Sequence, residues 1–161
     1  MVRAIMLDAL PAGGRIAEIG VLAGEFSRQI LDRCQPRCFD LVDVDFSQLR
    51  SDVRAAPAVT LHQGLSHEVL AGFEDRAFDW IYIDADHSCR GIRSDIEAAA
   101  PKVRRDGYLV FNDFARIVRP GLGVFGVHQA VSEFIVRERW QVTHFCMHPE
   151  ALYDIALRRP Y

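Results

Sequence analysis

In the segment FDWIYIDADHSCRG, a run of bulky, mostly apolar residues is followed by two carboxylates and an imidazole. Residues 78–83 have the composition of a strand that is buried on both faces. Asp84, Asp86 and His87 follow it directly. Polar groups at the end of a buried strand are costly unless they are paired. We therefore take this segment as a candidate site, where the acids and the histidine could act in proton transfer or bind a metal ion.

Two glycines four residues apart, Gly20 and Gly24, lie in the turn EIGVLAG after an earlier apolar run. They allow the backbone to approach a ligand closely where a helix begins. The turn lacks the G-x-G-x-x-G pattern of dinucleotide sites. Glu18 suits a cationic group of a ligand, and Asp45, after the next apolar run, suits the two hydroxyls of a ribose. The alternative is that the glycines only turn the chain and that Asp43 and Asp45 cap a helix start.

A later apolar run, YLVFND, ends in Asn112 and Asp113. If this run and the one before Asp84 are neighbouring parallel strands, the three side chains meet at one edge of the sheet. Two carboxylates and an amide oxygen form an incomplete oxygen shell of the kind that Mg²⁺ prefers. The alternative is structural: Asp84 caps the following helix, and His87 bonds Asp113 or a backbone carbonyl.

Short runs with strand composition alternate with amphipathic helical stretches along most of the chain. The strands are predicted at residues 15–20, 38–45, 58–63, 78–84 and 108–113. Apolar stripes at helical spacing separate them, and Ser88 is placed to cap the helix after the fourth strand. This alternation predicts a parallel sheet with right-handed crossovers.

The alternation stops after Trp140. Two strand-like runs, 141–148 and 152–159, follow without a helix between them and predict an antiparallel hairpin at one edge of the sheet. The expected fold is therefore an α/β, Rossmann-like three-layer sandwich with a seven-stranded, mostly parallel sheet. We expect a single domain that spans residues 1–161.

The composition bounds the class of protein. The chain has 161 residues, half of them hydrophobic, and a formal net charge of −3. Such a chain has no basic field for nucleic acid, and no apolar run long enough for a membrane span or a signal peptide. We expect a cytoplasmic protein with neither nucleic acid nor membrane as a partner. The four cysteines lack zinc-site spacing and are expected to be free thiols.

Five segments in this order resemble the class I S-adenosylmethionine-dependent methyltransferases. More narrowly, they resemble the small bacterial branch of metal-dependent sugar and natural-product O-methyltransferases. The resemblance runs from about Arg15 to the C-terminus. The segments are AEIGVLAGEFSRQIL, LVDVDFSQL, FDWIYIDADHSCRGIRSDI, RRDGYLVFNDF and GVHQAVSEF.

This resemblance implies a binding role for each end of the cofactor. Glu18 and the turn between the two glycines would hold the methionine end of S-adenosylmethionine. Asp45 would hold the ribose hydroxyls, with Asp43 as the alternative. The family usually has an acid near the adenine amino group, where this sequence has Leu65. Adenine would then be held by apolar contact and by Ser66.

The resemblance also implies how an acceptor is activated. Methyl transfer is an in-line displacement, and a neutral hydroxyl needs a general base or a bound cation to become a good nucleophile. By resemblance, Asp84, Asn112 and Asp113 are the candidate ligands of Mg²⁺, and Asp84 also lies beside the cofactor. His87 occupies the position of the base in the macrolide-sugar members, which makes His87 and Asp84 the candidate catalytic residues.

The function we expect is therefore O-methylation of a small hydroxylated molecule, such as a sugar or a natural-product intermediate. A cofactor-binding but inactive subunit is one alternative, and a metal-dependent hydrolase is another. The chain has little material for a lid, and the loop 114–126 is the only sizeable candidate. We accordingly expect a shallow pocket or one completed by a second subunit of a homo-oligomer.

Overall fold

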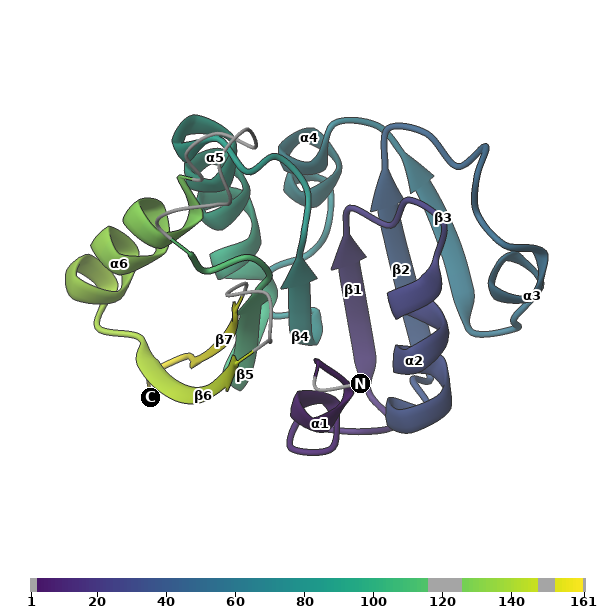
Figure 1. The fold of residues 1–161 in the computed structure, drawn as a ribbon, viewed down its shortest axis with the longest axis horizontal. Coiled ribbons are helices and arrows are strands. Elements are labelled where there is room, and N and C mark those ends of the chain that lie inside the picture. The colour runs from purple at the N-terminus through teal and green to yellow at the C-terminus, as the bar shows by residue number, and fades with distance from the viewer. Residues whose placement is uncertain (1–2, 116–125, 148–152, 161) are drawn as a thin grey trace.

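The computed structural model describes residues 3–115, 126–147 and 153–160. Within these ranges, seven strands form one sheet in the order β3-β2-β1-β4-β5-β7-β6 (Figure 1). The strands are β1 (Arg15–Ile19), β2 (Cys38–Asp43), β3 (Val59–Gln63), β4 (Phe78–Ile83), β5 (Val103–Phe111), β6 (Gln141–Met147) and β7 (Tyr153–Arg158). The helices are α1 (Arg3–Leu7), α2 (Glu25–Cys34), α3 (Ser51–Arg54), α4 (Ser66–Ala71), α5 (Cys89–Ala99), the 3₁₀ helix η1 (Ala100–Lys102) and α6 (Val127–Glu138).

The strands from β1 to β5 pair in parallel, and β7 pairs antiparallel with both β5 and β6. The predicted fold class is confirmed, including the antiparallel pair at the edge. The bounds of β6 and β7 differ from the predicted ranges, 141–148 and 152–159, by at most one residue at each end. The residues between the two strands, 148–152, lie outside the described residues. Among the described helices, none is both long and apolar enough to cross a membrane.

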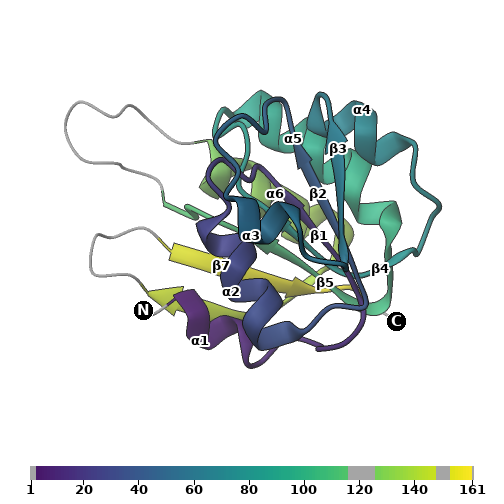
Figure 2. The same ribbon diagram turned by 90° about the vertical axis from the view of Figure 1, so that its right-hand side faces the viewer.

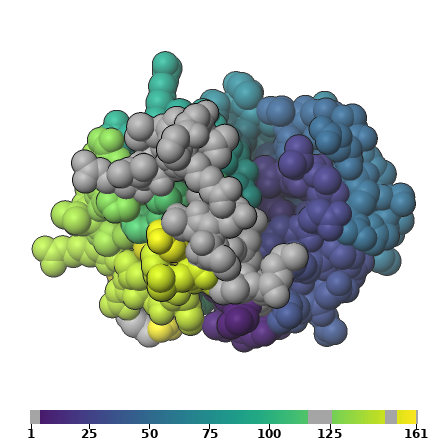
Figure 3. All heavy atoms as spheres, in the orientation of Figure 1, coloured from purple at the N-terminus to yellow at the C-terminus, as the bar shows by residue number. Residues whose placement is uncertain are grey.

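Two apolar clusters cover the two faces of the sheet, because side chains of a strand alternate between its faces. On β4, Ile81 and Ile83 pack with α4, α5 and α6, whereas Trp80 and Tyr82 pack with α1, α2 and α3. Figure 2 shows the two sets of helices on opposite sides of the sheet. In Figure 3 the early elements, in purple and blue, form one side of the molecule, and α6 with the last strands, in green and yellow, forms the other.

The fifth strand starts earlier than predicted. It begins at Val103, and its pairing with β4 is irregular between Phe78 and Trp80. The cause is the segment before Gly107: Asp106 adopts a left-handed backbone with φ 64°, so the strand bulges there and then continues. The effect of Asp106 is therefore local. At its other end β5 stops at Phe111, two residues before the predicted end, so Asn112 and Asp113 follow the strand.

The order of the strands reverses between β1 and β4, and this is where open α/β sheets bind ligands. The register aligns the ends of these strands: Ile19 pairs with Ile83, and Ile83 pairs with Phe111. The residues that follow each strand therefore lie together, as the sequence predicted for Asp84 and Asn112.

Candidate functional site

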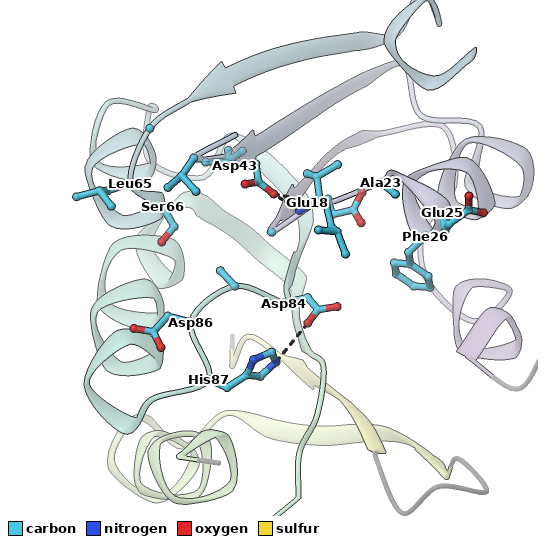
Figure 4. Close-up of a pocket in the computed structure, with 17 residues that line it drawn as sticks. Glu18, Ala23, Glu25, Phe26, Asp43, Leu65, Ser66, Asp84, Asp86 and His87 are labelled. Atoms are coloured by element: carbon cyan, nitrogen blue, oxygen red, sulfur yellow. Dashed lines mark hydrogen bonds and ion pairs between the residues drawn. The ribbon is translucent and has the colours of Figure 1, made fainter. Parts of the chain in front are cut away.

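A cavity of about 600 Å³ opens at the carboxyl ends of β1, β2 and β4 (Figure 4). Its volume is in the range of small-molecule sites. Of the predicted site residues, six line it: Glu18, Gly20, Leu65, Ser66, Asp84 and His87. The remaining four, Gly24, Asp45, Asn112 and Asp113, are not in its lining.

The carboxylate of Asp43 binds the backbone of the glycine turn after β1. Oδ2 of Asp43 accepts hydrogen bonds from the backbone amides of Val21 and Leu22, at 2.6 and 3.0 Å. Gly20 has φ 85°, and Gly24, with φ 78°, precedes the first residue of α2. Gly20 lines the cavity together with Val21, Leu22 and Ala23, whereas Gly24 does not.

The acid that lines the cavity at the end of β2 is Asp43, the alternative to Asp45. Asp45 is exposed, and its carboxylate accepts hydrogen bonds from the amide and the hydroxyl of Ser47, at 2.8 and 2.6 Å. These bonds lower the pKa of Asp45. The reason for the difference is that β2 ends at Asp43, so Asp45 already belongs to the following turn.

Glu18 is a buried carboxylate that faces the cavity. It is 2% exposed, and its Oε2 accepts a 2.5 Å hydrogen bond from the hydroxyl of Ser27 on α2, which is itself buried. Phe26, on the same helix, lines the cavity beside Glu18, and its ring lies 4.4 Å from that of Tyr82. The sequence does not mark Phe26 or Ser27 as site residues. Phe26 belongs to an apolar stripe typical of a core helix, and a serine inside a helix carries no distinctive signal.

The opposite end of the cavity is formed by the turn between β3 and α4. Leu65 is half exposed and Ser66 is half buried, and both line the cavity. Val44 contributes a further exposed apolar side chain. Figure 4 shows Ser66, Asp43 and Glu18 in this order from one end of the cavity to the other.

Asp84, His87 and Asp113 form a cluster at the edge of the cavity. Nε2 of His87 lies 3.3 Å from Oδ1 of Asp84 and 3.3 Å from Oδ2 of Asp113. The hydrogen bond to Asp84 raises the pKa of the His87 imidazole above its ordinary value, and the charge of Asp113 acts in the same direction against the effect of burial. Asp113 has a left-handed backbone with φ 52°, a strained conformation that is common at functional sites.

Two polar residues next to this cluster, Asn112 and Asp86, form hydrogen bonds with other side chains or backbone amides. Nδ2 of the buried Asn112 donates to Oδ1 of Asp84 at 2.7 Å. Asp86 accepts hydrogen bonds from the amide and the hydroxyl of Ser88, and Ser88 in turn caps α5 by accepting from the amide of Gly91. The predicted cap at Ser88 is confirmed, and the hydrogen bonds of Asp86 hold the turn before α5.

The ligand atoms of Asp84, His87 and Asp113 lie within 4.8 Å of one another, which is close enough for one metal ion. This set differs from the predicted set, because Asn112 directs its amide nitrogen at Asp84 and His87 supplies a nitrogen ligand. Two carboxylates with an imidazole fit a divalent cation, and they suit Zn²⁺ or Mn²⁺ as well as Mg²⁺. The donor chemistry therefore fits a metal site, and Asn112 as a ligand stays a prediction.

The family and fold of the chain are indicated by comparison with known proteins. A family model described as a methyltransferase domain matches residues 17–114. No protein with a curated description matches the sequence.

The structure of the N-methyltransferase NodS from Bradyrhizobium japonicum WM9 superposes with a TM-score of 0.75 at 17% identity, over 99% of this chain and 93% of that one. NodS in complex with S-adenosyl-L-homocysteine gives a TM-score of 0.75 at 18% identity, over 99% and 86%. A SAM-dependent methyltransferase from Aquifex aeolicus gives a TM-score of 0.74 at 12% identity, over 98% and 88%. At these identities the likeness establishes a common fold.

Proposed function

Because the chain belongs to the methyltransferase-domain family, we propose that it binds S-adenosylmethionine in this cavity and methylates a hydroxyl group of a small molecule. When bound, this cofactor supplies an electrophilic methyl group. The observation that carries the proposal is the order of the polar groups along the cavity. Glu18, Asp43 and Ser66 follow one another from one end to the other (Figure 4).

This order matches the order of groups in S-adenosylmethionine. Glu18 provides a buried negative charge for the ammonium group of the methionine end. Asp43 lies in the middle, where its carboxylate faces the ribose hydroxyls while it holds the glycine turn. Leu65 and Val44 provide apolar surface for the flat adenine base, with Ser66 at its edge.

Within this proposal His87 removes the proton of the acceptor. Its Nε2 lies at the edge of the cavity beside Asp84, and its raised pKa makes the imidazole a stronger base than an isolated histidine. Asp84 and Asp113 stabilise the imidazolium that forms when the proton is taken up.

A divalent cation is a second part of the proposal. Bound to the carboxylates of Asp84 and Asp113, it would lower the pKa of an acceptor hydroxyl. A cation that also binds His87 would prevent His87 from acting as the base, so the two roles exclude each other for this residue. Cation dependence thus decides which of the two routes the site uses.

The acceptor and the quaternary structure are further proposals. Residues 116–125, which make up most of the only sizeable lid candidate in the sequence, lie outside the described residues. We propose that a small hydroxylated molecule enters the cavity and that a second copy of the chain completes the pocket. The neighbour NodS is an N-methyltransferase, so amines are the competing class of acceptor.

Calorimetric titration with S-adenosylmethionine and S-adenosylhomocysteine tests the cofactor site. We expect micromolar binding to the wild type and to Glu97→Gln, a control on the exposed face of α5, and none to Glu18→Ala. Absence of binding to the wild type would refute the proposal and reopen the hydrolase alternative.

The acceptor is tested separately, by release of S-adenosylhomocysteine in the presence of sugars, phenols or amines, with and without Mg²⁺, Mn²⁺ or Zn²⁺. We expect turnover with a hydroxylated acceptor and its loss in His87→Ala. Turnover with amines alone would replace O-methylation by N-methylation. Binding without turnover on any acceptor would favour the inactive-subunit alternative.

A further inference from the structure

Asp95 is a buried carboxyl group behind the cavity that the proposed reaction does not use. It lies on α5 and is 1% exposed. Its Oδ1 accepts a hydrogen bond from the hydroxyl of Ser66, and its Oδ2 has no hydrogen-bond partner among the described residues. Burial raises the pKa of Asp95, and the hydrogen bond from Ser66 acts in the opposite direction. A carboxyl group in this position is unfavourable for folding, which suggests a role at the site beside it.

Ser66 connects Asp95 to the cavity. Its side chain is half buried at the start of α4, and it lines the end of the cavity next to Leu65. A serine hydroxyl has one proton to donate and two lone pairs to accept. An ionised Asp95 can only accept, so the Ser66 proton is directed at it and only lone pairs of Ser66 remain for a ligand. Ser66 can therefore accept a hydrogen bond in the cavity but cannot donate one.

We propose that Asp95 is a positioning residue that fixes Ser66 as a hydrogen-bond acceptor, so that this end of the cavity selects a base with an amino group over one with an oxo group. This inference rests on the proposed function, in which the adenine lies at the Leu65 and Ser66 end. The 6-amino group of adenine donates hydrogen bonds, whereas the 6-oxo group of hypoxanthine accepts them. An oxo group beside Oγ of Ser66 would place two acceptors together without a proton between them.

Sequence position supports the pairing of the two residues. Asp95 is one of the four buried residues of α5, with Ile92, Ile96 and Ala99, and it lies at the edge of this stripe next to Ala99. An acid on a core-facing stripe is rare without a partner. The partner is Ser66, which lies in the adjacent helix α4.

The experiment compares two ligands by calorimetry, S-adenosylhomocysteine and S-inosylhomocysteine, in which the 6-amino group is replaced by an oxo group. The wild type should prefer the adenosyl ligand by about tenfold. Ser66→Ala and Asp95→Leu should each reduce this preference to about unity, and the double variant should reduce it no further, because both changes remove the same interaction. Glu97→Gln, which removes an exposed acid of the same helix, should keep the wild-type preference.

The preference ratio separates positioning from a purely structural role, because loss of folded protein lowers the binding of both ligands together. An unchanged ratio in Asp95→Leu, or in Ser66→Ala, would overturn the inference. Asp95→Ala replaces the leucine variant if circular dichroism shows that the latter is unfolded. A wild type that binds the adenosyl ligand without preference overturns this inference alone, whereas a wild type that binds neither ligand overturns the proposed function and the inference with it.

Discussion

The backbone at Gly20 packs directly against the carbonyl oxygen of Asp84. A Cβ atom built on Gly20 would lie 2.1 Å from this oxygen, and the glycine has φ 85°. The contact joins the glycine turn after β1 to the segment after β4 that contains Asp84 and His87. The strand order reverses between these two strands. The contact explains why a glycine is needed here for two independent reasons, the backbone conformation and the close approach.

Gly20→Ala is therefore expected to destabilise the protein by about 2–4 kcal/mol and to abolish cofactor binding. Gly13→Ala is a matched control, because Gly13 also has a positive φ of 73° but has nothing within 4 Å of the added atom. It should cost about 1–2 kcal/mol. Chemical denaturation followed by fluorescence measures both, and equal costs would show that the contact with Asp84 is unimportant.

Asp43→Asn is expected to weaken binding of S-adenosylhomocysteine by about tenfold or more, because it removes a charge that holds the amides of Val21 and Leu22. Asp45→Asn should change affinity by about twofold at most, since Asp45 is exposed and bonds Ser47. Calorimetry on the two variants compares them directly. The reverse result would restore Asp45 as the ribose ligand.

Ser27→Ala is expected to lower the free energy of unfolding by about 1 kcal/mol and to weaken cofactor binding, because Ser27 donates to the buried carboxylate of Glu18. Ser47→Ala removes a similar bond, to Asp45, on the exposed surface and should change neither quantity appreciably. Thermal unfolding and calorimetry are the measurements. A Ser27 variant that binds like the wild type would show that Glu18 needs no orienting partner.

The His87 imidazole should titrate above its ordinary value of 6.5 in metal-free protein. Because the folded pKa is raised, the interaction with Asp84 and Asp113 stabilises the protein below the ordinary pKa, and this stabilisation is lost as the pH rises through the raised value. In the proposed mechanism the neutral imidazole is the base, so the methylation rate should rise over the same interval. NMR titration in the presence of a chelator measures the pKa, and Asp84→Asn should lower it. A titration at or below the ordinary value would contradict the assigned ion pairs.

Asp95→Asn is expected to raise the thermal midpoint at neutral pH. Burial raises the pKa of Asp95, so the carboxyl group favours the folded state below its ordinary pKa and loses this contribution as the pH rises through the raised value. The variant should therefore gain most at neutral pH and little in acid. Glu97→Gln should show no such dependence. A loss of stability in Asp95→Asn at neutral pH would indicate that the carboxylate is stabilised by more than its bond from Ser66.

The sequence by itself determined the fold class and the class I methyltransferase family, and it predicted the place of the site. These follow from local properties: apolar runs of strand length, helical stripes, the edge hairpin and the glycine turn, in an order that leaves few topologies. The family model and the fold neighbours confirm the family and the fold, whereas the place of the site and the metal-dependent O-methyltransferase branch stay predictions.

Only the tertiary structure decided which polar groups meet. Residues 43 and 45 would point to the same face of a strand, so the alternation of side chains does not tell Asp43 from Asp45. The structure distinguishes them, because β2 ends at Asp43. The amide of Asn112 takes its direction from Asp84, and Ser66 finds Asp95 on another helix. These choices depend on contacts between residues far apart in the chain, which local pattern does not encode.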